Sequence, residues 1–142
     1  MYLKISYDGQ IISIDCNPYI NVQGNIYLDR SGCLLLYINE DAYPRYDSNG
    51  RISSIGGTSI YYRGYTDYSF EQGKLKNIGS VSFYYRDSTS NTKEEVGKIK
   101  TIGGVSIYYC TYNDSSNLLG KPKQVGGRYI YYDSYGNVNR IS

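Results

Sequence analysis

The side chains that most often carry out catalysis are scarce in this sequence. None of the 142 residues is histidine, which removes the commonest general base, the commonest metal ligand and the usual partner of a serine or cysteine nucleophile. The adjacent carboxylates Glu94 and Glu95 fall in a loop-like segment and are interpreted as solvating charge. Each Gly-Gly pair separates two strand-like segments instead of opening a helix, so no phosphate-binding loop is indicated. We therefore expect a non-enzymatic protein without a cofactor or a metal.

The three cysteines, Cys16, Cys33 and Cys110, are predicted to be reduced thiols. Their number is odd and no CxxC spacing occurs, so neither a disulfide framework nor a zinc site is indicated. The first ten residues, MYLKISYDGQ, lack the charged start and apolar run of a secretory signal. No apolar stretch approaches the length of about 18 residues that spans a membrane. A cytoplasmic protein without a membrane partner is expected, with export by another route left open.

Tyrosine and lysine remain as the candidate binding residues. The chain has 20 tyrosines, against two phenylalanines and no tryptophan, and tyrosine suits the half-buried face of a sheet because its body is apolar and its tip is polar. The formal net charge is only +2, too small to demand a nucleic-acid or membrane partner.

Pairs of adjacent tyrosines recur along the chain at regular spacing. They lie at 61–62, 84–85, 108–109 and 131–132, and are therefore 23, 24 and 23 residues apart. Each unit begins at a glycine (Gly50, Gly73, Gly97 or Gly120), and residues 1–49 hold divergent forms of the same pattern. The sequence therefore predicts one domain over residues 1–142, built as a tandem array with regular tyrosine-rich repeats at 50–142.

Each unit of about 23 residues is predicted to be a β-hairpin. Gly103-Gly104 separates KIKTI from VSIYY, and such a pair fits a two-residue turn that requires positive φ angles. Counting outward from this turn pairs Ile102 with Val105 and Thr101 with Ser106. The fold class expected is all-β: an antiparallel meander with over half of its residues in strands and essentially no helix. The sheet is open or closed, or the array is solenoid-like.

Alternation along these strands predicts two faces. Ile102, Val105, Ile107 and Tyr109 share the better core face with the lysine stems of Lys98 and Lys100, and Ile99, Thr101, Ser106 and Tyr108 share the other. A β-bulge in KIKTI would instead bring Ile99 and Ile102 to one side. The tyrosines are interpreted as cross-strand cover for the lysine stems of the neighbouring strand.

Two sets of residues are candidate binding sites. The first comprises the long connections Arg63–Gln72, Arg86–Val96 and Cys110–Leu119, which we call the rim loops because they are expected at one edge of the array, where repeat insertions often bind partners. Their exposed aromatic candidates are Tyr65, Tyr68, Phe70 and Tyr112. The second is a possible Lys/Tyr face composed of Lys74, Lys76, Lys98, Lys100, Lys121, Lys123, Tyr85, Tyr109 and Tyr132, with Arg51 extending its row of cations.

Three segments resemble the YD repeats of Rhs-type proteins. They are YDSNGRISSI (46–55), YDSYGNVNRI (132–141) and YDGQIISI (7–14), and the likeness covers about a third of the chain. This resemblance implies β-hairpins wound into a shell. The phrase RYIYYDSYGNV also looks like the aromatic hairpin repeats of choline- and glucan-binding cell-wall modules, although those modules build their ligand cages from tryptophan. Neither resemblance implies catalytic residues.

Three functions fit these observations. The first is a binding or scaffolding protein that contacts a protein partner through the rim loops, or another copy through edge strands. The second is a carbohydrate-binding module with tyrosine stacking platforms. The third is a single-stranded nucleic-acid binder that uses the Lys/Tyr face, which the acidic residues of the rim loops and the small net charge disfavour.

Overall fold

The computed structural model describes residues 1–89 and 93–142 and is all-β. Within these residues two single-turn 3₁₀ segments, η1 (Lys93–Glu95) and η2 (Ser116–Leu118), are the only helical elements. The antiparallel hairpin fold is confirmed, but strands make up 44% of the chain and not over half of it. The predicted strand content was too high, because the rim loops and the turns take up more of each unit than was expected.

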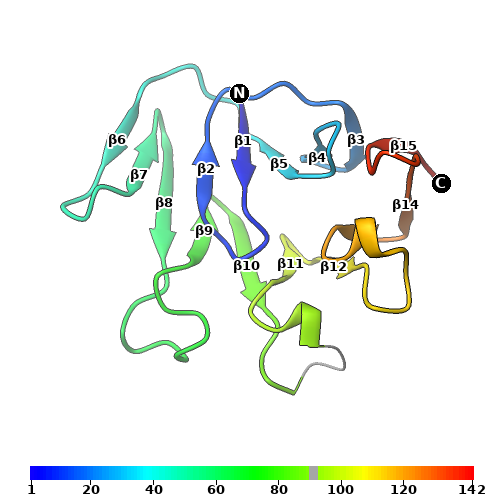
Figure 1. The fold of residues 1–142 in the computed structure, drawn as a ribbon. Helices are drawn as coiled ribbons and strands as arrows, with labels where there is room; N and C mark the ends of the chain where they lie inside the picture. The colour runs from blue at the N-terminus through cyan, green and yellow to red at the C-terminus, as the bar shows by residue number, and fades with distance from the viewer. Residues whose placement is uncertain (90–92) are drawn as a thin grey trace.

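The strands of the repeat region form one ten-stranded antiparallel sheet in chain order, β6 to β15, which confirms the meander (Figure 1). Its edges, β6 and β15, do not meet, so the sheet is open. The strands are β6 (Pro44–Tyr46), β7 (Ile52–Ile55), β8 (Thr58–Tyr62), β9 (Leu75–Ile78), β10 (Val81–Tyr85), β11 (Ile99–Ile102), β12 (Val105–Tyr109), β13 (Pro122–Val125), β14 (Arg128–Tyr132) and β15 (Val138–Ile141).

The Gly-Gly pairs form the expected two-residue turns. Gly103 and Gly104 have φ angles of 57° and 82°, and the turn pairs Ile102 with Val105 and Thr101 with Ser106 as predicted. In the equivalent turn Gly79-Ser80 only the glycine has positive φ, as a type II′ turn requires. Serine is tolerated at the second position for this reason.

A β-bulge decides which residues of each unit face the core. In β11, Thr101 pairs with Tyr84 but Ile99 pairs with Tyr85, so Lys100 is the extra residue. Ile99 and Ile102 are consequently buried on the same side while Lys100 is exposed. The bulge alternative is confirmed, and the assignment of Lys100 to the core face and of Ile99 to the opposite face was wrong. Equivalent register shifts recur at four other strand pairs of this sheet.

Residues 1–43 do not continue the meander. They form a separate five-stranded sheet in the order β2-β1-β5-β4-β3. In this sheet β1 pairs directly with β5, although β2, β3 and β4 lie between them in the sequence. The two sheets bury one shared core, and Figure 1 shows β1 and β2 in front of β9 and β10. The strands are β1 (Tyr2–Ile5), β2 (Ile11–Ser13), β3 (Ile20–Gln23), β4 (Ile26–Leu28) and β5 (Leu34–Tyr37).

Turns of the five-stranded sheet bond to the bulges of the ten-stranded sheet. The backbone N–H groups of Leu75, Ile99 and Val138, which occupy the same position in successive units, donate to the carbonyls of Gly9, Tyr7 and Arg30 at 2.8, 2.7 and 2.7 Å. The same position in β13 is Pro122, which has no N–H to satisfy. Three of the amides at the bulges are thus paired by turns of the first sheet. We call the side facing the five-stranded sheet the inner face and the opposite side the outer face.

Candidate functional site

The rim loops begin and end at the same backbone positions in every unit. The residue after the second tyrosine accepts a bond from the glycine that starts the next unit, as in Gly73 N–H to Arg63 O (2.8 Å) and Gly97 N–H to Arg86 O (2.8 Å). The short turn 133–136 closes in the same way, with Gly136 N–H to Asp133 O at 3.0 Å. The loops are therefore insertions into a fixed frame, and in Figure 1 they extend from the edge opposite the Gly-Gly turns.

The residue at this closing position depends on the length of the loop. In the short turns it is aspartate: the Oδ1 atom of Asp133 accepts the N–H groups of Tyr135 and Asn137 at 2.9 Å each, and these bonds lower the pKa of its carboxyl group. In two long loops it is arginine. Arg63 donates to Phe83 O at 2.7 Å and Arg86 to Ile107 O at 2.8 Å, so each guanidinium ties its loop to the following hairpin.

Buried carboxylates complete these two anchors. Glu71 and Glu95 are each 8% exposed, and their Oε2 atoms lie 3.8 Å from the Nε atoms of Arg63 and Arg86. Glu95 also accepts the N–H of Tyr109 at 3.2 Å. A buried charge is tolerated only when it is paired, and removal of its partner is strongly destabilising. Both glutamates therefore stabilise the bases of their loops.

The rim aromatics divide into exposed and anchored side chains. Tyr65, Tyr68 and Tyr112 are 91%, 74% and 75% exposed, as the sequence interpretation required. Phe70 instead packs against the core and stacks on Tyr68 with ring centroids 5.8 Å apart. Residues 90–92 of the loop Arg86–Val96 lie outside the described residues.

The Lys/Tyr candidates do not form one face, because the bulge separates the two lysines of each unit. Lys74, Lys98 and Lys121 lie at the inner side, above the rings of Tyr85, Tyr109 and Tyr132 with Nζ 5.1, 5.0 and 5.6 Å from the ring centroids. Each also donates to the carbonyl of the glycine that opens the next unit (Gly97, Gly120 or Gly136). Burial lowers the pKa of Lys74 and Lys98. Arg51 likewise lies over Tyr62.

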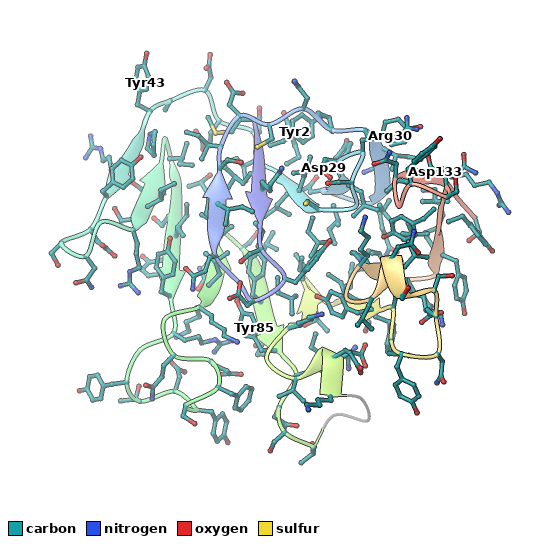
Figure 2. The ribbon with its side chains drawn as sticks, viewed as in Figure 1. Tyr2, Asp29, Arg30, Tyr43, Tyr85 and Asp133 are labelled. Carbon is teal, nitrogen blue, oxygen red and sulfur yellow. The ribbon has the colours of Figure 1, made fainter. Side chains whose placement is uncertain are left out.

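The second tyrosine of each pair is a structural residue. The hydroxyl groups of Tyr85 and Tyr109 donate to the carbonyls of Leu75 and Ile99, ten residues earlier, at 2.6 and 2.9 Å. Both rings are buried, and burial raises the pKa of both phenols far above the ordinary value. Figure 2 shows Tyr85 beside the β1–β2 turn. The predicted pairing of these tyrosines with lysines is seen at the ammonium groups, which lie over the rings of Tyr85 and Tyr109.

The first tyrosine of each pair was not a candidate from the sequence, yet it is the exposed one. Tyr61, Tyr84, Tyr108 and Tyr131 are 57%, 52%, 43% and 41% exposed on the outer face. Lys76, Lys100 and Lys123 are exposed on the same face. Alternation had placed Tyr108 on the face opposite Tyr109, and this was the signal that could have identified the exposed set.

The remaining titratable groups are the acidic side chains and the thiols. Among the described residues, no three His, Cys, Asp or Glu side chains are grouped so that they would hold a metal ion. Cys16, Cys33 and Cys110 are free thiols, and burial raises the pKa of Cys110. No helix in the described part of the chain is long and apolar enough to cross a membrane.

No family model, curated protein or solved structure matches the chain. The resemblance to YD repeats and to cell-wall repeats therefore stays a prediction.

Proposed function

We propose that this protein is a non-enzymatic binding protein that contacts a protein partner through its rim loops, with the sheets as a rigid frame. The observation that supports it best is that Tyr65, Tyr68 and Tyr112, each at least 74% exposed, lie on insertions whose bases are closed by the same backbone bonds in every unit. Loops on a rigid scaffold are common binding sites.

The composition of the loops suits protein recognition. Their tyrosines stand among serine, threonine, asparagine and glycine, and tyrosine offers a large amphipathic contact at low cost in conformational entropy. In the loop Arg63–Gln72, which carries Tyr65 and Tyr68, the Arg63 anchor lowers that cost further, because a loop held at both ends has less freedom to lose on binding.

Self-association through β6 is the less favoured mode of protein contact. Pro44 lies on this edge strand, and proline, which has no N–H to donate, protects edges against the addition of another strand.

Binding of single-stranded nucleic acid is also less favoured. The ammonium groups of Lys74, Lys98 and Lys121 already donate to backbone carbonyls, and Lys123 pairs with Asp114 at 3.1 Å.

The test replaces the exposed rim tyrosines without shortening the loops. A triple variant, Tyr65→Ser, Tyr68→Ser and Tyr112→Ser, keeps both arginine anchors and changes only exposed side chains, so we expect its melting curve to stay close to wild type. A partner captured by the wild-type protein is identified and its affinity measured by calorimetry. The triple variant should bind it at least about tenfold more weakly.

Tyr43→Ser is the matched control. Tyr43 is 94% exposed but precedes β6 and lies far from the rim loops, as its label in Figure 2 shows. This control should retain full affinity. Equal affinity of the triple variant and the wild type would exclude the rim as the site.

A further inference from the structure

The outer face of the ten-stranded sheet carries two tyrosine rings that lie flat over buried cations. The guanidinium carbon of Arg63 is 5.1 Å from the ring centroid of Tyr84, and that of Arg86 is 4.8 Å from the ring centroid of Tyr108. The arginine side chains are only 10% and 13% exposed, whereas the rings are 52% and 43% exposed. Each ring therefore covers its guanidinium and presents the opposite face to solvent.

The two rings form a regular pair. Tyr84 and Tyr108 occupy equivalent positions in their units, on β10 and β12 with β11 between them. Because Tyr84 is level with Thr101 and Ser106, Tyr108 lies two residues further along, and the two positions are about 9.5 Å apart across the strands and about 7 Å apart along them. The rings lie against cations that are held in place, because each guanidinium also donates to a backbone carbonyl. They are stacking platforms that lose little conformational freedom when a ligand binds.

Small hydroxyl side chains fill the space between and beside the rings. Thr101 on β11 pairs with Tyr84 on one side and with Ser106 on the other, and Ser82 precedes Tyr84 by two residues on the same face. All three side chains are half-buried. Hydroxyl groups both donate and accept hydrogen bonds, so this surface matches a ligand rich in hydroxyl groups.

The charges around the rings do not suit a polyanion. The guanidinium groups lie beneath the rings and Lys123 is paired with Asp114 at 3.1 Å, which leaves Lys76 and Lys100 as the exposed lysines of this face. The cations closest to the two rings, Arg63 and Arg86, are thus covered by the rings and paired with buried carboxylates. A neutral ligand fits this balance better than a chain of phosphates or sulfates.

We propose that Tyr84 and Tyr108, with Ser82, Thr101 and Ser106, form a binding strip for an extended, uncharged polysaccharide. The apolar faces of two sugar rings stack on the two tyrosines, and the intervening hydroxyl groups bond to the serine and threonine side chains. This site is separate from the rim tyrosines of the proposed function and does not require that function.

The test uses native affinity electrophoresis in gels that contain one polysaccharide each: soluble β-1,4-glucan, β-1,3-glucan, α-1,4-glucan, xylan or mannan. At least one should retard the wild-type protein. The double variant Tyr84→Ala/Tyr108→Ala should lose about tenfold or more of that affinity. Tyr84→Phe/Tyr108→Phe keeps the rings and should stay within about threefold of wild type, which separates stacking from a general loss of structure.

The triple rim variant Tyr65→Ser, Tyr68→Ser and Tyr112→Ser serves as the second control and should be retarded as strongly as wild type. Failure of every polysaccharide to retard the wild-type protein would overturn the proposal, as would unchanged retardation of the alanine variant. Gels with heparin or poly(dT) test the polyanion alternative: retardation there, abolished by the alanine substitutions and absent with neutral polymers, would assign the strip to anionic chains instead.

Discussion

Adjacent tyrosines have opposite roles in each unit, and their partners explain why. Tyr109 is buried and bonded to Ile99 O, whereas Tyr108 is 43% exposed above Arg86. Alternation along β12 sends the two side chains to opposite faces. Composition alone therefore does not separate the tyrosines that stabilise the sheet from those that are available to a ligand.

The Tyr108/Tyr109 pair allows a matched test of this difference. Tyr109→Phe removes a hydroxyl group and leaves the buried carbonyl of Ile99 without that partner, so it should lower the free energy of unfolding by about 1–2 kcal/mol. Tyr108→Phe removes a hydroxyl group from an exposed ring and should change it by less than about 0.5 kcal/mol. Urea unfolding followed by circular dichroism measures both. Equal effects would contradict the assigned roles.

The turn glycines give a second test at the residue scale. Gly103 has a φ of 57°, so Gly103→Val should destabilise the protein by about 1–3 kcal/mol, because a β-branched side chain is strained in this region. Gly127, at the second position of the equivalent turn, is not among the glycines with positive φ and has open space at its Cβ position. Gly127→Ala is therefore expected to melt close to wild type. Similar melting of both variants would show that the turn geometry is wrong.

At the scale of elements, the β1–β2 turn is held against the ten-stranded sheet by close packing as well as by hydrogen bonds. The carbonyl of Gly9 accepts the N–H of Leu75, and a Cβ atom at Gly9 would overlap the phenol of Tyr85. Gly50 has nearly the same φ angle, 80° against 87°, but open space around it. The two glycines thus share backbone strain and differ in packing.

Substitution of these two glycines by alanine should separate the two effects. Gly50→Ala is expected to cost about 1 kcal/mol, from positive φ alone. Gly9→Ala should cost about 1–3 kcal/mol more, because the new methyl group forces the buried ring of Tyr85 to move. Thermal unfolding of both variants provides the measurement. A smaller loss for Gly9→Ala than for Gly50→Ala would show that the turn does not pack on Tyr85.

The sequence predicted some features of these elements and not others. The turn glycines predicted the register of Ile102 with Val105, because a two-residue turn permits one pairing. The bulge at Lys100 could only be offered as an alternative, because it depends on burial of Ile99 against the other sheet. The order of β1 to β5 rests on long-range pairing that no local pattern encodes. The exposed rim tyrosines were found from loop composition, whereas the outer tyrosines were not chosen as candidates although alternation had placed Tyr108 on the face opposite Tyr109.

At the scale of the whole molecule, buried phenols should set the stability of the fold in alkaline solution. Burial raises the pKa of Tyr7, Tyr85, Tyr109 and Tyr132 well above the usual value. The unfolded chain releases these protons near pH 10 and the folded protein does not, so the unfolded state binds fewer protons as the pH rises. Their contribution to stability is complete below about pH 10 and is lost above it, by up to about 1.4 kcal/mol per tyrosine for each pH unit.

The pKa shifts of the lysines that lie over these rings act on stability in the opposite direction and over a different pH range. Burial lowers the pKa of Lys74 and Lys98, so their contribution rises with pH only until the unfolded lysines also lose their protons, near about pH 10.5. Above that pH only the tyrosine effect remains. We therefore expect the free energy of unfolding, measured by urea titration from pH 8 to 11.5, to fall steeply at the alkaline end, with tyrosinate absorbance rising as the protein unfolds. Tyr109→Phe should make this fall in the free energy of unfolding less steep, by the contribution of one tyrosine. A free energy of unfolding that stays constant above pH 10.5 would show that these phenols are not buried.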